Sequence, residues 1–529
     1  MLSSKLSYNY MMIAPHHLAA KTGSEILKEG GNAIEAMIAS AAMISVVYPH
    51  MNSMGGDNFW LISDKDKNVY AIDSCGPAAN NANVEFFKNR GFSAIPSRGP
   101  FAALTVPGAV AGWKLAYDFS VKNLGGKIPI SRLLFDAEQT AKEGVAVTNT
   151  LRNNLKSKLN QLIDIVGFKD VFFKNGKIPN VGDRLVFPKL SNTFSCLIKN
   201  GLDDFYSGEI FSRIISDLDL LGSPLNSDDL KSYKATFVDP LELKIKDAKL
   251  FNLPPPTQGL ASILILGVLE ELSVDCKNDV QLIHLIVEIT KEAFKIRDKY
   301  IADPRYMSVN VNDFLKKDFI KKLANQINFK RATPWPVSSV GGDTVWLGAT
   351  DMYGNSISFI QSIYWEFGSG LILPKTGITM QNRGVSFSLD PKNHNSLVSG
   401  RKPFHTIQPA MAHFDDGRVM SYGTMGGEGQ PQTQATIFYR YNVQNSNLQK
   451  AVNEPRWLLG KTWGEDSTSL KIEDRFSYDT YDNLKSMGHI VEKVGAYEEI
   501  MGHAGALVSY PSGLKEGGYD LRSDGTAIG

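Results

Sequence analysis

The stretch GGDTVWLGATDMYGNSISFIQS, residues 341–362, has the pattern of a β-hairpin whose first strand begins at a threonine. Apolar residues alternate along 345–349, the segment 351–355 turns the chain, and alternation resumes at 357. Thr344 would therefore open a strand directly after two glycines and an aspartate. Threonine favours strands and glycine favours turns, so the ordinary start of a strand is one interpretation of this stretch.

A chemical interpretation is the alternative, because a threonine becomes a strong nucleophile when its own backbone amine is free to take the hydroxyl proton. For an internal threonine, the preceding peptide bond has to be cut first. Gly341 and Gly342 would let the backbone bend so that the Thr344 hydroxyl attacks the Asp343 carbonyl. An N→O acyl shift followed by hydrolysis would then free the Thr344 amine. This chemistry would explain why one threonine begins a strand.

The same chemistry requires an oxyanion hole and a second hydroxyl near the nucleophile. Gly426 and Gly427 stand between a predicted strand and a predicted helix, where backbone N–H groups form a concavity that suits an oxyanion. A simple turn between the two elements explains these glycines equally well. Ser362 is the candidate for the second hydroxyl.

Outside the hairpin, the sequence predicts mainly helices before Thr344 and paired strands after it. Helices are expected at 18–28, 34–47, 281–301, 430–443 and 447–459. A mainly helical middle is expected from 131 to 233. Strands are expected at 58–63, 69–73, 344–350, 356–363, 409–414, 418–423 and 504–509. The pattern indicates an α+β sandwich in which helices cover paired sheets. The change at 344 is the nearest feature to a domain boundary, and it lies inside the hairpin instead of in a linker.

Composition and charge restrict the classes of function. The chain has 529 residues, and its 56 basic and 55 acidic side chains leave no broad field for nucleic acid or an anionic membrane. Neither the three cysteines nor the nine histidines show metal-ligand spacing, and no metal or organic cofactor is expected. The cysteines form no disulfide pattern, and no signal peptide or membrane span is visible. These features predict a cytoplasmic location.

Six separated segments, in order, resemble the gamma-glutamyltransferase family of N-terminal-nucleophile hydrolases over essentially the full chain. They are residues 25–62, LTVPGAVAGW (104–113), LPPPTQG (253–259), GDTVW (342–346), GTMGGEGQPQTQ (423–434) and residues 502–529. The resemblance implies self-cleavage between Asp343 and Thr344. It also implies the four-layer αββα sandwich, with residues 1–343 and 344–529 as two processed subunits that remain one structural unit.

Carried over by position, the family's catalytic roles fall on four residues of this chain. Thr344 matches the processed N-terminal nucleophile, and Ser362 falls where the family has a threonine that hydrogen-bonds the nucleophile. Gly426 and Gly427 match the oxyanion pair. The resemblance therefore implies that the Thr344 amine, once free, is the general base.

The substrate pocket departs from that of the enzymes that hold a glutamyl group. Cys75 stands where an arginine holds the glutamyl α-carboxylate, and a Ser-Ser pair is replaced by His405 and Thr406. The positions of the three acceptors that hold the α-amine read Tyr364, Arg383 and Ser386. The loss of these acceptors and the gain of Arg383 predict a pocket for an anion without an ammonium group.

This pattern resembles the transferase-like acylase branch of the family, to which oxamate amidohydrolase belongs. We therefore predict a self-cleaving amidohydrolase that cuts a small amide, such as oxamate, through an ester on Thr344. Arg383, His405, Thr406 and Tyr364 would line the substrate side, and Arg98 is a second candidate anion contact, with an ordinary surface-loop arginine as its alternative.

Two other functions stay open at this point. One is a glutathione hydrolase or gamma-glutamyltransferase, and the other is a processed scaffold without catalysis. The expected partners are a small amide substrate and the chain's own two subunits, with a homodimer left open and with neither nucleic acid nor a membrane.

Overall fold

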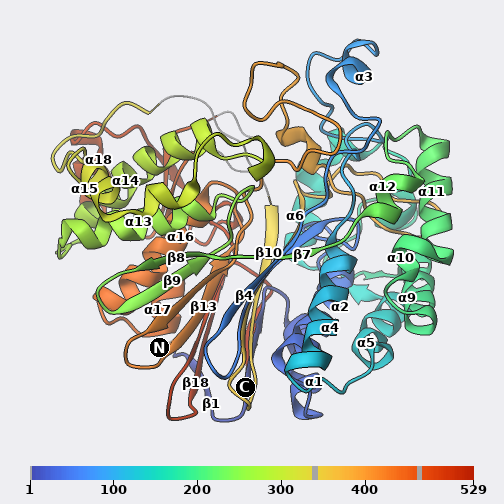
Figure 1. Cartoon of the computed structure of the whole chain (residues 1–529), viewed down its shortest axis with the longest axis horizontal. Helices are drawn as coiled ribbons and strands as arrows, with labels where there is room; N and C mark the ends of the chain where they lie inside the picture. Colours follow the sequence, from blue (N-terminus) through green and yellow to red (C-terminus); the bar gives the residue numbers. More distant parts are fainter. Residues whose placement is uncertain (1–2, 336–342, 461–466) are drawn as a thin grey trace.

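Two seven-stranded antiparallel sheets form the centre of the computed structural model, which describes residues 3–335, 343–460 and 467–529 (Figure 1). The β13 sheet has the order β1 (Lys5–Ser7), β18 (Lys515–Tyr519), β17 (Ala504–Ser509), β13 (Val419–Thr424), β12 (Ala410–Phe414), β9 (Ala248–Asn252) and β8 (Leu241–Lys244). The β10 sheet has the order β19 (Thr526–Ile528), β2 (Met11–Ala14), β10 (Asp343–Thr350), β11 (Ser356–Tyr364), β3 (Asp57–Ser63), β4 (Val69–Ser74) and β7 (Thr236–Val238).

The two sheets pack face to face, and helices cover both outer faces (Figure 1). Phe59 and Leu61 of β3 meet Phe251 of β9 and Met411 of β12 in the core between the sheets. The β10 sheet is covered by α1 (His17–Lys28), α2 (Ala33–Val47) and α4 (Ala109–Asn123). The β13 sheet is covered by α13 (Gly259–Leu272), α16 (Gly429–Phe438) and α17 (Leu448–Asn453), and α14 (Asp279–Tyr300) packs on α13 and α16. The predicted α+β sandwich is confirmed.

The α2 helix shows how local sequence fixes an element of this fold. Asn32 caps the helix, because its side chain accepts hydrogen bonds from Ile34 N and Glu35 N while the Glu35 carboxylate accepts one from Asn32 N. Every residue of α2 is buried, as expected for a helix that is apolar on all sides. The helix predicted after Asn32 is therefore confirmed.

The predicted helical middle is present and contains one small hairpin. Its helices are α5 (Ile130–Glu143), α6 (Asn149–Ser157), α7 (Leu159–Leu162), α8 (Phe168–Phe172), α9 (Pro188–Asn200), α10 (Asp204–Ser207), α11 (Glu209–Leu221) and α12 (Ser227–Ser232). The hairpin pairs β5 (Val145–Ala146) with β6 (Arg184–Leu185). The remaining helices are α3 (Val84–Lys88), α15 (Lys317–Ala324) and α18 (Tyr478–Ser486). Within the described ranges, no helix combines the length and apolar composition that crossing a membrane requires.

The predicted helix at 447–459 is wrong in its second half. The α17 helix ends at Asn453, two residues before Pro455, because a proline disfavours helical backbone at the residue before it. The following residues form β14 (Trp457–Leu459), which pairs with β15 (Leu470–Glu473) and through it with β16 (Val491–Val494). The helix predicted at 430–443 is present in two forms. The α16 helix covers Gly429–Phe438, and a π-helical turn follows at Tyr439–Val443.

Both sheets take strands from each side of the Asp343–Thr344 peptide bond. In the β10 sheet, β10 lies between β2 and β11, and in the β13 sheet, β12 lies between β9 and β13. The parts before and after this bond are thus woven together by backbone hydrogen bonds. Gly341 and Gly342, the predicted bend, lie outside the described residues.

Candidate active site

Thr344 lies at the start of β10, at an irregularity in the sheet. Asp343 pairs with Tyr364 but Val345 pairs with Gln361, so the register shifts at Thr344 and forms a β-bulge. The Thr344 hydroxyl donates to Ser362 Oγ at 3.3 Å, and Ser362 Oγ also accepts from Tyr364 N at 2.8 Å. Thr344 and Ser362 are both buried. The structure therefore brings the predicted nucleophile and its predicted hydroxyl partner together across two neighbouring strands.

The start of β10 faces the end of β13 across the gap between the sheets. Trp346 fills this gap, since a Cβ added at Gly423 of β13 would lie 2.1 Å from the Trp346 ring. Thr344 lies on the same side as Trp346, because Thr344 bonds Ser362 and Trp346 bonds Ser358, and these two serines share one face of β11. Gly426 and Gly427 follow the end of β13, three and four residues after Gly423. The chain therefore enters the two glycines from the sheet that faces β10.

The backbone of Gly426 and Gly427 has the conformation that glycine favours, with φ angles of 111° and 52°. In the described part of the chain, neither N–H group makes a hydrogen bond, whereas the carbonyl groups accept from backbone N–H groups, Gly426 O from Gly429 N and Gly427 O from Gln430 N. Two free N–H groups ahead of α16 are the donors that an oxyanion needs. This arrangement suits an oxyanion hole, while the bond from Gly429 N to Gly426 O is also that of a tight turn, so the oxyanion role of the two glycines stays a prediction.

A buried hydrogen-bond network holds the Gly427 peptide from behind. Gln258 Nε2 donates to Gly427 O at 2.8 Å and to Thr406 O at 2.5 Å, and Gln258 Oε1 accepts from Arg297 Nη1 at 3.0 Å. Arg297 Nη2 in turn binds Glu428 Oε1 at 2.6 Å. The sequence analysis missed this network, because LPPPTQG shows no chemical pattern and its partners lie far away in the chain. Gln258 ties the oxyanion glycines to the loop that carries His405 and Thr406.

We expect Gln258→Ala to lower kcat by about tenfold to a hundredfold while KM changes little, because the Gly427 carbonyl would lose the hydrogen bond that holds this backbone segment in place. Steady-state amidase kinetics on the mature protein measure this effect. Gln449→Ala is the matched control, since Gln449 of α17 is equally buried but donates its hydrogen bond to Tyr519 O of β18 instead of to the glycines. Equal losses in both variants, or a loss confined to KM, would contradict a positioning role for Gln258.

Arg383 is the charged centre of the substrate side. It lies in the short 3₁₀ helix η3 (Arg383–Ser386), it is 1% exposed, and neither Nη1 nor Nη2 has a hydrogen-bond partner among the described residues. Its guanidinium lies 3.7 Å from the centre of the Tyr364 ring. Burial lowers the pKa of Arg383 to about 10, so the group stays charged at neutral pH. A buried cation without an anionic partner is costly and indicates a place for an anion.

Tyr364 is held under Arg383 by an unusual backbone conformation. Its φ angle is 80°, a left-handed value that costs a bulky residue of the order of 1–3 kcal/mol. Tyr364 is the last residue of β11, two residues after Ser362, and donates its N–H to Ser362 Oγ. One local distortion thereby joins the nucleophile side to the anion side.

His405, Thr406 and Asp57 complete a group of buried polar atoms around Arg383. Both ring nitrogens of His405, the Thr406 hydroxyl and Asp57 Oδ2 have no hydrogen-bond partner in the described part of the chain. His405 Nε2 lies 3.7 Å from Asp57 Oδ2. Burial and the nearby charges of Arg383 and Lys402 hold the pKa of His405 well below its usual range, so its ring is neutral. Unsatisfied buried polar atoms are rare in proteins, and several together indicate a ligand site.

Asp57 was missed by the sequence analysis, although the sequence carries a signal for it. Gly55-Gly56-Asp57 precedes a strand in the same way as Gly341-Gly342-Asp343 does. Asp57 pairs with Ser362 in the register of β3 and β11. It therefore lies in line with Thr344 and Ser362 across three neighbouring strands.

Arg98, the second predicted anion contact, has other partners. Its Nη1 donates to Glu366 O at 2.6 Å and to Gly368 O, and its Nη2 donates to Gln161 Oε1 at 3.0 Å. These contacts hold the loop after β11, which neither the anion contact nor the surface-loop arginine of the sequence analysis anticipated, and the anion contact of Arg98 stays a prediction. The arginine that faces the buried polar group is Arg383.

A cavity of about 220 Å³ lies next to the site. Its wall includes Ser386, at the end of η3, and Phe404, directly before His405, together with Arg297 of the network behind Gly427. Ser386 Oγ is another buried polar atom without a hydrogen-bond partner in the described part of the chain. The cavity thus adjoins the segments that carry Arg383 and His405.

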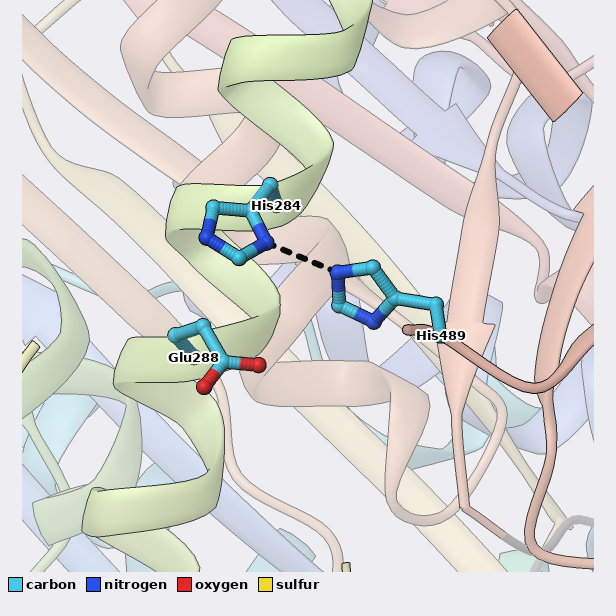
Figure 2. Close-up of side chains that lie close together, drawn as sticks. All are labelled: His284, Glu288 and His489. Carbon is cyan, nitrogen blue, oxygen red and sulfur yellow. Dashed lines mark hydrogen bonds between the residues drawn. The ribbon is translucent and has the colours of Figure 1, made fainter. Parts of the chain in front are cut away.

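His284, Glu288 and His489 are the group of described residues whose ligand atoms lie close enough to hold a metal ion (Figure 2). His284 Nδ1 and His489 Nε2 already share a hydrogen bond of 2.8 Å. The Glu288 oxygens accept from Lys291 Nζ at 2.6 Å and from Thr333 N and Oγ1 at 2.9 and 2.6 Å. The Lys291 ammonium already supplies a positive charge to Glu288, and the two histidines already bond each other. This cluster therefore fits a structural hydrogen-bond network better than a metal site.

Known proteins are similar to this chain in both sequence and fold. A sequence profile described as gamma-glutamyltranspeptidase matches residues 19–529. The chain is 47% identical to the oxamate amidohydrolase proenzyme of Klebsiella pneumoniae and 36% identical to the glutathione hydrolase-like YwrD proenzyme of Bacillus subtilis, with 100% of each chain covered in both cases. The crystal structure of cephalosporin acylase from Bacillus halodurans superposes with a TM-score of 0.91 at 30% identity, covering 100% of this chain and 97% of that one.

Proposed function

Since the chain belongs to the gamma-glutamyltranspeptidase family and is a hydrolase or transferase, we propose that it is a self-cleaving amidohydrolase for a small anionic amide such as oxamate. The observation that carries the substrate class is the buried Arg383, whose Nη atoms have no partner in the described part of the chain. The name of the similar Klebsiella pneumoniae protein, oxamate amidohydrolase proenzyme, agrees with an anionic amide and with a precursor form.

Self-cleavage begins with attack of the Thr344 hydroxyl on the Asp343 carbonyl carbon. The Asp343–Thr344 C–N bond breaks as the acyl group moves from nitrogen to oxygen, and water hydrolyses the resulting ester. The products are the Asp343 carboxylate and a Thr344 with a free amine and a free hydroxyl. The hydrogen bond from Thr344 to Ser362 and the bulge at Thr344 support this role.

Amide hydrolysis then uses the same hydroxyl on the substrate. The Thr344 amine takes the hydroxyl proton as Oγ attacks the amide carbon, and the N–H groups of Gly426 and Gly427 stabilise the oxyanion. The amine returns the proton to the leaving nitrogen, ammonia departs, and an acyl ester remains on Thr344. Water, deprotonated by the same amine, hydrolyses this ester and releases the acid. Ser362 orients the nucleophile throughout.

A glutathione hydrolase is the second candidate, because the similar Bacillus subtilis protein is named glutathione hydrolase-like. That activity requires acceptors for the glutamyl α-amine. In this chain the three positions that hold the α-amine in such enzymes read Tyr364, Arg383 and Ser386, and Arg383 is a cation. The Asp57 carboxylate could accept from an ammonium group, but the charge of the neighbouring Arg383 opposes one, so the site disfavours an ammonium group.

A panel of amides tests the proposed function. We expect oxamate, malonamate or succinamate to release ammonia with a kcat/KM at least about a hundredfold above that for a γ-glutamyl anilide, because Arg383 repels the glutamyl ammonium. Ammonia release and anilide absorbance measure the two activities on one preparation of mature protein. Faster turnover of the anilide would establish the glutathione hydrolase instead. If the protein cuts no amide and a threonine-directed probe does not label Thr344, the remaining function is that of a processed scaffold without catalysis.

A further inference from the structure

Asp57 lies in the line of residues that runs from the nucleophile to the anion site. Thr344, Ser362 and Asp57 occupy three adjacent strands, β10, β11 and β3. Asp57 has the same strand orientation as Phe59 and Leu61, which face the core between the sheets. With neighbouring strands about 4.8 Å apart, Asp57 lies about 10 Å from Thr344, a span that suits an acyl group of roughly two to four carbons.

One carboxylate oxygen of Asp57 accepts hydrogen bonds from the backbone, and the other has no hydrogen-bond partner among the described residues. Oδ1 accepts from Gly76 N at 3.1 Å and from Gly108 N at 3.2 Å. Oδ2 has no hydrogen-bond partner in the described ranges, and the residue is 1% exposed. His405 Nε2, at 3.7 Å, is too far from Oδ2 for a hydrogen bond, and the Gln381 side chain is a further polar neighbour of the carboxylate. No ion pair joins Asp57 and Arg383 in the described part of the chain. Oδ2 is thus free for a ligand.

The surroundings of Asp57 determine its charge. Burial raises the pKa of Asp57 to about 7, although the N–H groups of Gly76 and Gly108, the Gln381 side chain and the Arg383 charge all favour the ionised form. The other titratable groups packed around it are Cys75 and Asp73 at the end of β4, Tyr206 and Tyr233 from the helical middle, Arg383, His405 and Lys402.

Most of these neighbours keep one charge state near neutral pH. Burial raises the pKa of the Cys75 thiol and of both tyrosine hydroxyls, and the pKa of His405 lies well below its usual range, so these groups are neutral. Arg383 stays a cation, and Lys402 is paired with Asp73 at 2.6 Å. Asp57 is therefore the group of this cluster whose charge changes near neutrality.

We infer that Asp57 is a specificity-determining residue, which as the neutral acid donates its Oδ2 proton to the carboxylate of the substrate while Arg383 supplies the positive charge. This inference rests on the proposed function and narrows it to monoamides of short dicarboxylic acids. An ionised Asp57 would repel the substrate anion and would partly neutralise Arg383. Substrate binding above neutral pH therefore includes the uptake of one proton by Asp57.

The test compares the wild type with Asp57→Asn, whose amide donates at every pH while its oxygen still accepts from Gly76 and Gly108. Steady-state kinetics with oxamate between about pH 5.5 and 8.5 cover the relevant range. In the wild type, KM should rise about tenfold for each pH unit above about 7, and in Asp57→Asn it should be independent of pH. Oxamide, a neutral analogue, should show no such rise. Asp64→Asn, at the other end of β3, is the matched control and should behave as the wild type.

The outcomes separate this inference from the proposed function. Turnover of oxamate with the same rise of KM in wild type and Asp57→Asn would overturn the role of Asp57 and leave the amidohydrolase intact. If oxamate is not cut at any pH, the proposed substrate is wrong, and calorimetry of oxalate binding decides about Asp57. Uptake of close to one proton at about pH 8 in the wild type, and none in Asp57→Asn, would support the inference. Equal uptake, or no binding of oxalate, would overturn it.

Discussion

Thr344→Ala is expected to remain a single chain and to lose amidase activity by on the order of 10⁴-fold or more, because one hydroxyl performs both the self-cleavage and the attack on the substrate. The wild type should separate into two pieces, residues 1–343 and 344–529, under denaturing conditions. Intact-mass measurement on the two purified proteins checks the cut, and ammonia release checks the activity.

Thr344→Ser is the informative control for this result. It keeps a hydroxyl at the same bulge and should still cleave itself and retain part of the activity. A wild type that stays in one piece would remove the free amine from the mechanism, since Thr344 N would remain in a peptide bond. A cut chain whose Thr344→Ala variant is also cut would place the nucleophile elsewhere.

Arg383→Met is expected to reduce kcat/KM for an anionic amide by about a hundredfold or more, with most of the change in KM, because the substrate carboxylate would lose its buried counter-charge. Kinetics with oxamate measure the loss. Arg383→Lys should recover part of the affinity, since an ammonium keeps the charge but not the two-pronged geometry of guanidinium.

The matched control for Arg383 is Arg401→Met. Arg401 is similarly buried, but its guanidinium binds the carbonyl groups of His394 and Ser396 instead of facing the polar group. An unchanged KM in Arg383→Met, in protein with a normal melting temperature, would show that the anion is bound elsewhere. A comparable loss in Arg401→Met would indicate that both effects come from damaged packing.

The sequence predicts those parts of the fold that depend on neighbours in the chain. The hairpin from Thr344 to Ser362 follows from alternation, and α2 follows from the cap at Asn32. The helix predicted through 459 is wrong because apolar spacing alone does not separate a short helix from the strand after Pro455.

The site divides in the same way. Thr344 and the two glycines could be proposed from the sequence because their local settings, a strand that starts at a threonine and a pair of glycines before a helix, also suit a nucleophile and an oxyanion hole. The two glycines before Asp57 mark its position but not its role, and Gln258 has no local mark; the roles of both depend on partners such as His405 and Gly427, which lie more than a hundred residues away. Contacts of that kind arise from the packing of the two sheets and are not visible in spacing.

The weaving of both sheets across the Asp343–Thr344 bond has a consequence for the cut protein. Because β10 is hydrogen-bonded to β2, and β12 to β9, the two pieces could separate only if the backbone hydrogen bonds inside each sheet were broken. Their separation would be the same event as unfolding, and because it releases two pieces, the melting temperature of the cut protein should depend on its concentration. The uncut Thr344→Ala chain, which unfolds as one molecule, should show no such dependence.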